Sequence, residues 1–107
     1  MTEIKLLEAI EHKALNEFAE LLGVTPEEII AKDTRSHISD IRPLYCKLRH
    51  EKHDVNYSKI GREINRTHTA VRHAVFRIDD LFSIKDVKIE AMWNRVKNIP
   101  ARSFELY

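Results

Sequence analysis

The chain has 107 residues, of which 43% are hydrophobic, while only two are glycine and three are proline. This length fits one domain, and this composition excludes a disordered chain and favours a mostly helical protein. The single cysteine, Cys46, excludes an internal disulfide and indicates a reducing, cytoplasmic location. No apolar run approaches the roughly 20 residues of a membrane span, and no signal pattern opens the chain, so we expect no membrane contact.

The formal net charge of +1 conceals a strong segregation of charge along the chain. Residues 1–34 carry three Lys/Arg and eight Asp/Glu, whereas residues 35–77 carry ten and four, together with five of the six histidines. Residues 78–107 carry five of each sign. Because affinity for phosphate depends on the local potential, a basic centre beside an acidic N-terminal part is compatible with nucleic-acid binding.

Residues 2–22 are predicted to form an acidic amphipathic helix. Its apolar stripe consists of Ile4, Leu7, Ile10, Ala14, Phe18 and Leu21, and Gly23 follows where a C-cap is expected. Such a stripe either packs on the domain core or binds a protein partner or a second copy through residues 2–22. We therefore divide the chain into this helix (1–23), a helical domain (24–100) and a tail (101–107).

A second, short helix is predicted after Thr25. Thr25 can cap it and Glu28 can close a capping box, so we expect it to end near Lys32 and residues 33–39 to form a connection. The next predicted helix runs from about residue 39 to residue 53. Pro43 must then lie in its first turn, where a missing N–H costs little, and its buried side consists of Ile41, Leu44, Tyr45 and Leu48.

Residues 57–78 hold two helical patterns joined by a tight turn, which predicts a helix-turn-helix. Tyr57, Ile60 and Ile64 share one face of the first helix, and Gly61 is expected to leave room for a second helix to cross. Thr67 is a good N-cap for a helix that begins near His68. The apolar stripe of this helix consists of Val71, Ala74, Val75, Ile78 and Leu81.

The opposite face of the second helix carries Thr69, Arg72, His73 and Phe76 at spacings i, i+3, i+4 and i+7. A helix that stands on a core and presents donors and positive charge fits a DNA major groove. After it, the run Ser83 to Asp86 is similar to a capping box and predicts a last helix through about Lys97. We expect four side chains of that helix to close the core: Val87, Ala91, Trp93 and Val96.

The residues of the helix-turn-helix also carry a family resemblance. Its motif consists of Ile60-Gly61-Arg62, Arg66, His68-Thr69, Val71 and His73-Ala74. It resembles the signature of the C-terminal DNA-binding domain of the bacterial replication initiator DnaA, and the similarity extends from about Val24 to Leu81. The resemblance implies an all-α, Trp-repressor-like fold of five or six helices with a central helix-turn-helix. It also implies sequence-specific binding of double-stranded DNA, with the second helix in the major groove.

The resemblance further implies roles for single residues. The family counterparts of His68 and Thr69 read bases, Arg66 matches the arginine that opens the motif, and Arg42 aligns with an arginine inserted into the minor groove. A solvated surface position is the alternative for Arg42, with Arg35 or Arg49 in its place. This chain departs from the family at four positions, so its target can differ from the initiator's usual DNA box: His50, Thr67, Ala70 and Arg72.

Together these observations predict a DNA-binding site and no catalytic site. The predicted contacts are Arg42, Lys59, Arg62, Arg66, Thr67, His68, Thr69, Arg72 and His73, with Lys47 and Lys52 as further candidate phosphate contacts. A nucleotide-binding loop needs Gly-Lys-Ser/Thr, but Gly23 and Gly61 precede Val24 and Arg62, so we expect no nucleotide and no enzymatic activity.

The histidine pair His50 and His53 is interpreted as solvated and partly phosphate-facing. The two could share a helix face and a metal ion, but without a clear third ligand we expect no metal and no cofactor. The predicted function is that of a small regulator of replication or transcription that binds DNA. The alternative is a protein-interaction module that binds a replication or transcription partner through the acidic N-terminal helix.

Overall fold

The computed structural model describes residues 13–31 and 36–100. Within these ranges the chain forms six α-helices and one π-helical turn, with no strand, which confirms the predicted all-α class. The elements are α2 (Lys13–Leu22), α3 (Pro26–Ile30), α4 (Ser36–Lys47), η1 (Leu48–Lys52), α5 (Tyr57–Ile64), α6 (His68–Ser83) and α7 (Val87–Val96). None of the helices in the described ranges is long and apolar enough to span a membrane.

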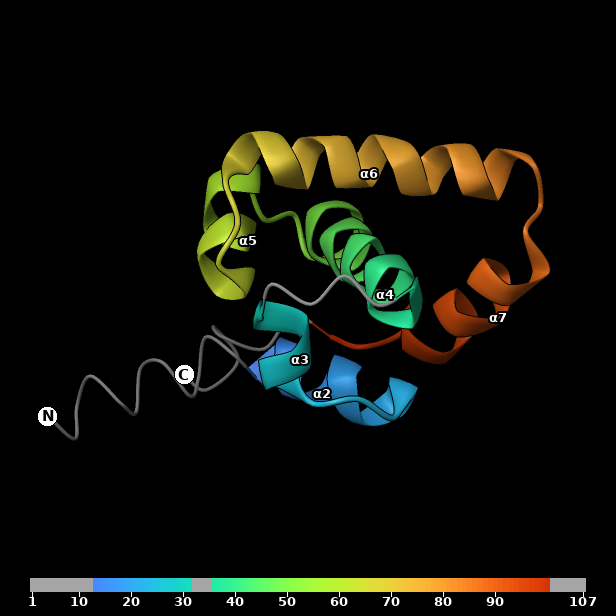
Figure 1. Ribbon diagram of the computed structural model, residues 1–107, viewed down its shortest axis with the longest axis horizontal. Coiled ribbons are helices and arrows are strands. Elements are labelled where there is room, and N and C mark those ends of the chain that lie inside the picture. Colours follow the sequence, from blue (N-terminus) through green and yellow to red (C-terminus); the bar gives the residue numbers. More distant parts are fainter. Residues whose placement is uncertain (1–12, 32–35, 101–107) are drawn as a thin grey trace, which may run out of the picture.

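Helix α4 lies at the centre of the fold, between α6 on one side and α2 and α3 on the other (Figure 1). Its Leu44, Tyr45 and the following Leu48 are fully buried, and Ile41 is nearly so, as the sequence predicts. Val71, Val75 and Ile78 of α6 are buried in the same core. Burial of each large apolar side chain stabilises the fold by about 1.5 to 3 kcal/mol, so this central contact fixes the position of α6.

Helix α2 packs into the same core through Leu15, Phe18 and Ala19. The Phe18 ring meets the Tyr45 ring edge-on at a centroid distance of 5.2 Å. Packing on the core is therefore observed for the described half of the predicted N-terminal helix, although Leu21, expected on the same stripe, is 45% exposed. Residues 2–12 of that helix lie outside the described residues.

The predicted helix caps at the two ends of the α2–α3 connection, Gly23 and Thr25, are confirmed. Gly23 has a φ of +74° and ends α2 in a Schellman arrangement, in which the Val24 N–H donates to the Ala19 carbonyl at 3.0 Å. Thr25 caps α3, because its hydroxyl oxygen accepts from the Glu28 N–H at 3.1 Å while the Glu28 carboxylate accepts from the Thr25 N–H at 2.9 Å. The capping box thus fixes the direction in which α3 leaves the turn.

The predicted start of α4 is wrong. The helix begins at Ser36, inside the segment expected to be a connection, so Pro43 lies in the helix interior instead of the first turn. Proline there removes one helical hydrogen bond, a cost that the burial of this segment against α6 offsets. Helix α4 then passes into η1, whose end is marked by a bond from the Val55 N–H to the Arg49 carbonyl at 2.9 Å.

The predicted start of α7 is also wrong. Helix α6 continues to Ser83, so Ser83 cannot cap the next helix, and Asp86 caps it by accepting from the Ile89 N–H at 3.0 Å. This shift turns Val87 outward, where it is 81% exposed. Ala91 is also exposed. Val96 is buried, as predicted, Ile89 takes the place of Val87 and Ala91 in the core, and Trp93 is half-buried against Phe82.

A buried ion pair joins the end of the central helix to α5. The Arg49 guanidinium donates to both carboxylate oxygens of Glu63, at 2.9 and 2.7 Å, and the Tyr45 hydroxyl donates to one of them at 2.5 Å. Arg49 is 3% exposed and Glu63 is 4% exposed, so Arg49 cannot reach a DNA groove in place of Arg42. Burial, aided by the Glu63 charge, raises the pKa of Tyr45 well above its usual value, which keeps the phenol protonated as a donor.

Candidate nucleic-acid interface

The turn between α5 and α6 has the geometry that the sequence predicts. Asn65 ends α5 in the left-handed conformation, with a φ of +59°. The next N–H, that of Arg66, donates back to the Gly61 carbonyl at 2.8 Å. Thr67 caps α6, because its hydroxyl oxygen accepts from the Ala70 N–H at 3.1 Å. Helix α6 therefore begins at His68, with its first turn fixed relative to α5.

The sequence led us to expect that Gly61 leaves room for a crossing helix, but in the structure Gly61 leaves room for the backbone of the turn. A Cβ atom at Gly61 would lie far inside van der Waals contact of the Arg66 carbonyl oxygen, which belongs to the backbone and cannot move aside. The absence of a side chain lets the chain fold back tightly on the end of α5. The glycine thereby sets the position of the residues that open α6.

Helix α6 has one buried and one exposed face along its first three turns. Val71 and Val75 are 1% and 3% exposed, and they hold the helix on α4. The side chains predicted to point outward are all exposed: Thr69, Arg72, His73 and Phe76. Thr67 and His68, at the start of the helix, are exposed as well. The outward face thus combines hydroxyl and imidazole groups with one guanidinium and one aromatic ring.

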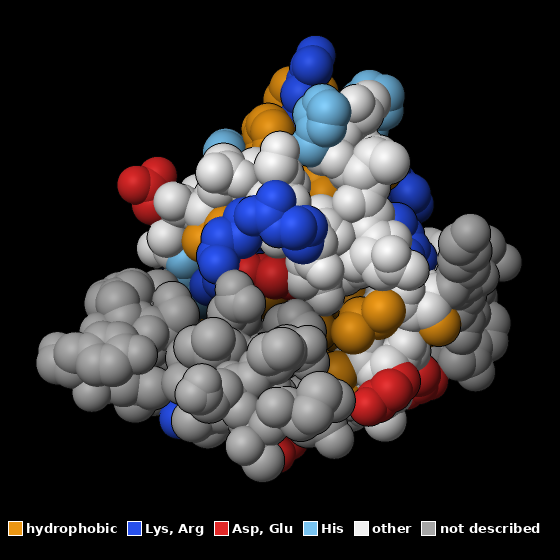
Figure 2. Space-filling model, turned by 90° about the vertical axis from the view of Figure 1, so that its left-hand side faces the viewer, with side chains coloured by type: hydrophobic (Ala, Val, Ile, Leu, Met, Phe, Trp, Pro, Cys, Tyr) orange, Lys and Arg blue, Asp and Glu red, His pale blue; other side chains and the backbone are white. Residues whose placement is uncertain are grey.

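Positive charge surrounds this face. Residues 57–77 contain five Lys/Arg and a single acidic residue, Glu63, whose charge is already paired with Arg49 in the interior. Figure 2 shows Lys, Arg and His side chains gathered on the side of the molecule that holds α5 and the start of α6. A surface of this kind attracts polyanions, because no acidic side chain of this segment remains unpaired to cancel the cations.

The predicted phosphate contacts differ in their exposure to solvent. Lys52 and Arg62 are exposed and Lys59 is half-exposed, and Arg62 borders an open depression in front of the turn, together with Asn65 and Thr67. Lys47 is different, since its ammonium contacts Glu51 and Asp79 at 2.8 Å each and lies over the Phe82 ring. Its assignment as a phosphate contact is therefore wrong, because its donors and charge are used within the fold.

Arg66, which the motif predicts as a DNA contact, donates to backbone carbonyls in the structure. Its guanidinium binds the carbonyl oxygens of Ile30 at 3.0 Å and Ala31 at 2.7 Å, the last residue and the C-cap of α3. It also binds the carbonyls of Ile64 and Asn65, at 3.1 and 3.0 Å, at the end of α5. The side chain thus links the ends of two helices across the turn.

Arg42 donates to the same helix end from the opposite side. Its Nε binds the Ile29 carbonyl at 2.8 Å and its Nη2 binds the Ala31 carbonyl at 3.0 Å. The last carbonyls of a helix have no partner within it, and α3 has no basic residue in the last of its described turns, so the two arginines satisfy them. Sequence reasoning missed this role, because a five-residue helix shows that donors are needed but not which distant residues supply them.

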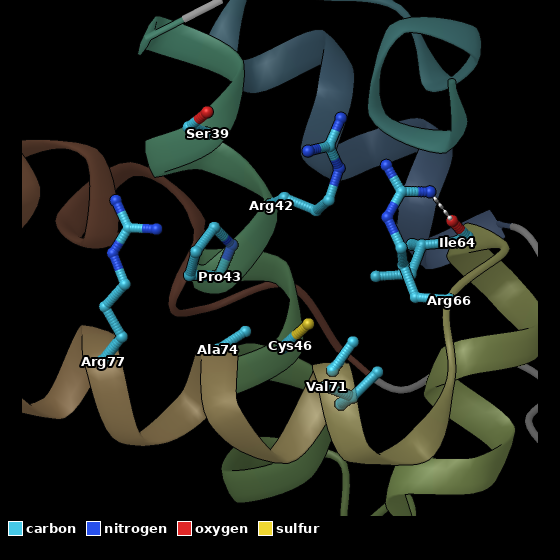
Figure 3. A pocket seen from close by; sticks show the side chains of 10 residues that line it. Ser39, Arg42, Pro43, Cys46, Ile64, Arg66, Val71, Ala74 and Arg77 are labelled. Carbon is cyan, nitrogen blue, oxygen red and sulfur yellow. Dashed lines mark hydrogen bonds between the residues drawn. The ribbon is translucent and has the colours of Figure 1, made fainter. Parts of the chain in front are cut away.

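A cavity of about 160 Å³ lies between α4, the turn and the first half of α6 (Figure 3). Its floor is apolar, formed by Pro43, Cys46, Val71 and other side chains, and three arginines line its edge: Arg42, Arg66 and Arg77. Figure 3 shows Arg42 and Arg66 directed toward α3 and Arg77 on the other side of the cavity. Positive charge therefore continues from the outward face of α6 toward α4.

The expectation of solvated, phosphate-facing histidines is wrong for His50 and His53. The His50 ring stacks on Tyr57 at 4.3 Å, and its Nδ1 lies 3.1 Å from the Val55 carbonyl oxygen. The His53 Nδ1 lies 2.9 Å from an Arg49 nitrogen that can only donate, so Nδ1 accepts and Nε2–H donates to the Ile99 carbonyl at 2.6 Å. Among the described residues, no group of three or more His, Cys, Asp or Glu side chains is placed to hold a metal ion.

Comparison with known proteins identifies the family. The family described as bacterial dnaA protein helix-turn-helix matches residues 13–78, which extends from α2 to within α6 and so begins before Val24. No curated protein and no solved structure gives a significant match. The family match covers well over half of the chain, and the matched range includes α5, the turn and α6 as far as residue 78. The chain belongs to the DnaA helix-turn-helix family, which indicates DNA binding.

Proposed function

We propose that this protein binds double-stranded DNA in a sequence-specific manner, with α6 in the major groove. The observation that carries the proposal is the two-faced character of α6. Val71 and Val75 hold one face on the core, and the other presents the exposed side chains that open the helix, with positive charge around them. Because this helix is fixed by its cap and by buried contacts, its outward side chains keep a constant register relative to the core.

In this proposal the first turns of α6 read base edges. His68 and Thr69 can donate to or accept from bases, Arg72 can bind a guanine, and the hydroxyl of Thr67 can still donate while its oxygen caps the helix. Thr67 and Ala70 replace the aspartate and the second threonine expected from the family motif. We therefore propose a target that differs from the initiator's usual DNA box.

The remaining predicted residues serve the backbone of the DNA. Lys59, Arg62 and His73 contact phosphates on either side of the recognition helix in this proposal. Arg42 and Arg66 contribute charge near the turn while their donors hold the end of α3. Neutralisation of several phosphates predicts an affinity that falls steeply as salt rises.

The proposed role is that of a small cytoplasmic regulator of replication or transcription that acts by occupying sites on DNA. It needs no nucleotide, metal ion or other cofactor for this. The alternative of a protein-interaction module has less support in α2, because Leu15, Phe18 and Ala19 of that helix are buried in the core and not presented to a partner.

A double substitution tests the proposal. Arg62→Ala combined with Arg72→Ala removes two exposed cations from the recognition side, so we expect affinity for duplex DNA to fall more than tenfold. The slope of log K against log salt should fall by roughly 1 to 2. The matched control is Lys88→Ala with Arg95→Ala, two exposed cations of α7. Equal affinity of both double variants in fluorescence anisotropy would contradict this placement of DNA on α6.

A further inference from the structure

Phe76 is a large aromatic side chain that the fold leaves 52% exposed. It lies on the outward face of α6, four residues after Arg72 and seven after Thr69, so it extends the proposed recognition surface by one helical turn. The core at this level is filled by Val75 and Ile78, which are buried on the other face. Phe76 therefore contributes nothing to the apolar interior, and its exposure calls for another use.

The Arg72 guanidinium lies over the Phe76 ring, with its Cζ 5.5 Å from the ring centroid. A cation over an aromatic face is held by the ring quadrupole, and this attraction uses no hydrogen bond of the cation. Within the described part of the chain, the Arg72 side chain makes this contact and no hydrogen bond or ion pair. The ring thus restricts the arginine without using the donors that would bind a ligand.

We infer that Arg72 and Phe76 act as one specificity element, which reads a guanine next to a pyrimidine that carries a C5-methyl group. This inference rests on the proposed function of sequence-specific DNA binding. The fork of Arg72 matches the O6 and N7 acceptors of guanine in the major groove. The part of the Phe76 ring that Arg72 leaves open provides an apolar surface for a methyl group, as thymine presents there.

The spacing of the two side chains fits this assignment. Residues i and i+4 are separated by about 6 Å along a helix, and successive bases of one strand are separated by about 3.4 Å along the DNA axis. A helix inclined in the groove therefore brings such a pair over neighbouring bases. A phosphate contact by Arg72 would leave the exposed ring of Phe76 without a partner. The assignment to a guanine and a neighbouring methylated pyrimidine uses both side chains.

The test begins with a duplex selected from a randomised pool by the unaltered protein. Arg72→Lys keeps the charge but loses the fork, so it should lower affinity for the selected duplex roughly tenfold and relax the preference for guanine at one position. Phe76→Leu keeps an apolar side chain at a helical position and should relax the preference for the neighbouring thymine. Lys88→Ala serves as the control on α7, and thermal unfolding reports whether each variant is folded.

Single-atom changes in the DNA give the sharper arm of the test. Replacing the thymine by uracil removes only the methyl group and should weaken binding about fourfold in the unaltered protein but not in Phe76→Leu. Replacing it by 5-methylcytosine should retain the contact of the methyl group, and cytosine should not. If the selected duplex is bound but uracil substitution and both variants leave base preference unchanged, the inference is overturned while the proposed function stands. If no duplex is bound, both are overturned.

Discussion

Cys46 is 1% exposed, and its burial makes the free energy of unfolding depend on pH. Burial raises the pKa of its thiol from 9.0 to about 12, although the Arg42 charge acts in the opposite direction. In the unfolded chain the thiol ionises from about pH 9, whereas in the folded chain it stays protonated until about pH 12. The stability linked to Cys46 is therefore fully present below pH 9 and is lost as pH rises toward 12.

The expected loss between about pH 8 and about pH 11 is about 2 to 3 kcal/mol from this thiol. Cys46→Ala should remove that part of the pH dependence, whatever its effect on stability at pH 8. Urea unfolding of both proteins at the two pH values measures the difference. Tyr45→Phe is the control, because it removes the neighbouring phenol, whose pKa is also raised by burial, and leaves the cysteine contribution in place. Equal loss in Cys46→Ala and the unaltered protein would contradict the assignment.

Single residues also show where sequence reasoning ends. Thr67 and Gly23 were predicted in their roles because capping depends on neighbours within a few positions of the chain. Arg49 and Arg66 were not, because their partners Glu63 and Ala31 lie 14 and 35 residues away. A surface arginine and one that satisfies a distant carboxylate or carbonyl have the same sequence context, so only the fold distinguishes them.

Helix α3 depends on arginines from outside its own sequence. Arg66→Ala removes a guanidinium whose two Nη atoms make four hydrogen bonds to the carbonyls at the ends of α3 and α5, so we expect the free energy of unfolding to fall by about 2 kcal/mol. Arg62→Ala, at an exposed position of α5, is the matched control and should change stability by about 0.5 kcal/mol or less. Chemical denaturation measures both variants.

The same pair of variants separates a structural arginine from a DNA contact. If Arg66 acts only through DNA, Arg66→Ala should change the free energy of unfolding no more than Arg62→Ala does. That result would contradict the capping role. If it acts only through α3 and the turn, Arg66→Lys should recover part of the stability, because an ammonium can still donate to some of the carbonyls. The assay is the same denaturation experiment without DNA.

At the level of elements, periodicity predicted which helices exist but not all of their limits. The stripes that contain Leu44 and Val71 identified α4 and α6 and their buried faces. The starts of α4 and α7 were misplaced because several residues in each connection can cap a helix. In the second case Ser83 and Asp86 compete, and α6 continues to Ser83, where its Phe82 packs edge-on against Trp93 of α7, which is a tertiary effect.

In the whole molecule, α4 is the support on which the two helices of the helix-turn-helix are placed. It contacts α6 along its length, and the Arg49–Glu63 pair fixes η1 to α5. The overall net charge of +1 gives no sign of this arrangement, because the acidic residues lie mostly in the N-terminal part while residues 57–77 carry one acidic residue against five basic ones. Sequence predicted that segregation, and the fold concentrates it on one side (Figure 2).

The most direct test of the central claim is to measure equilibrium binding of the unaltered protein to duplex DNA by fluorescence anisotropy, at about 50 and about 200 mM salt. The ligands are a randomised pool, the best duplex selected from it and a fragment with the initiator's box. We predict that affinity falls steeply with salt and that the selected duplex binds at least roughly a thousandfold more tightly than the pool. Absence of binding at the lower salt concentration, or equal affinity for all three ligands, would contradict a sequence-specific reader built on α6.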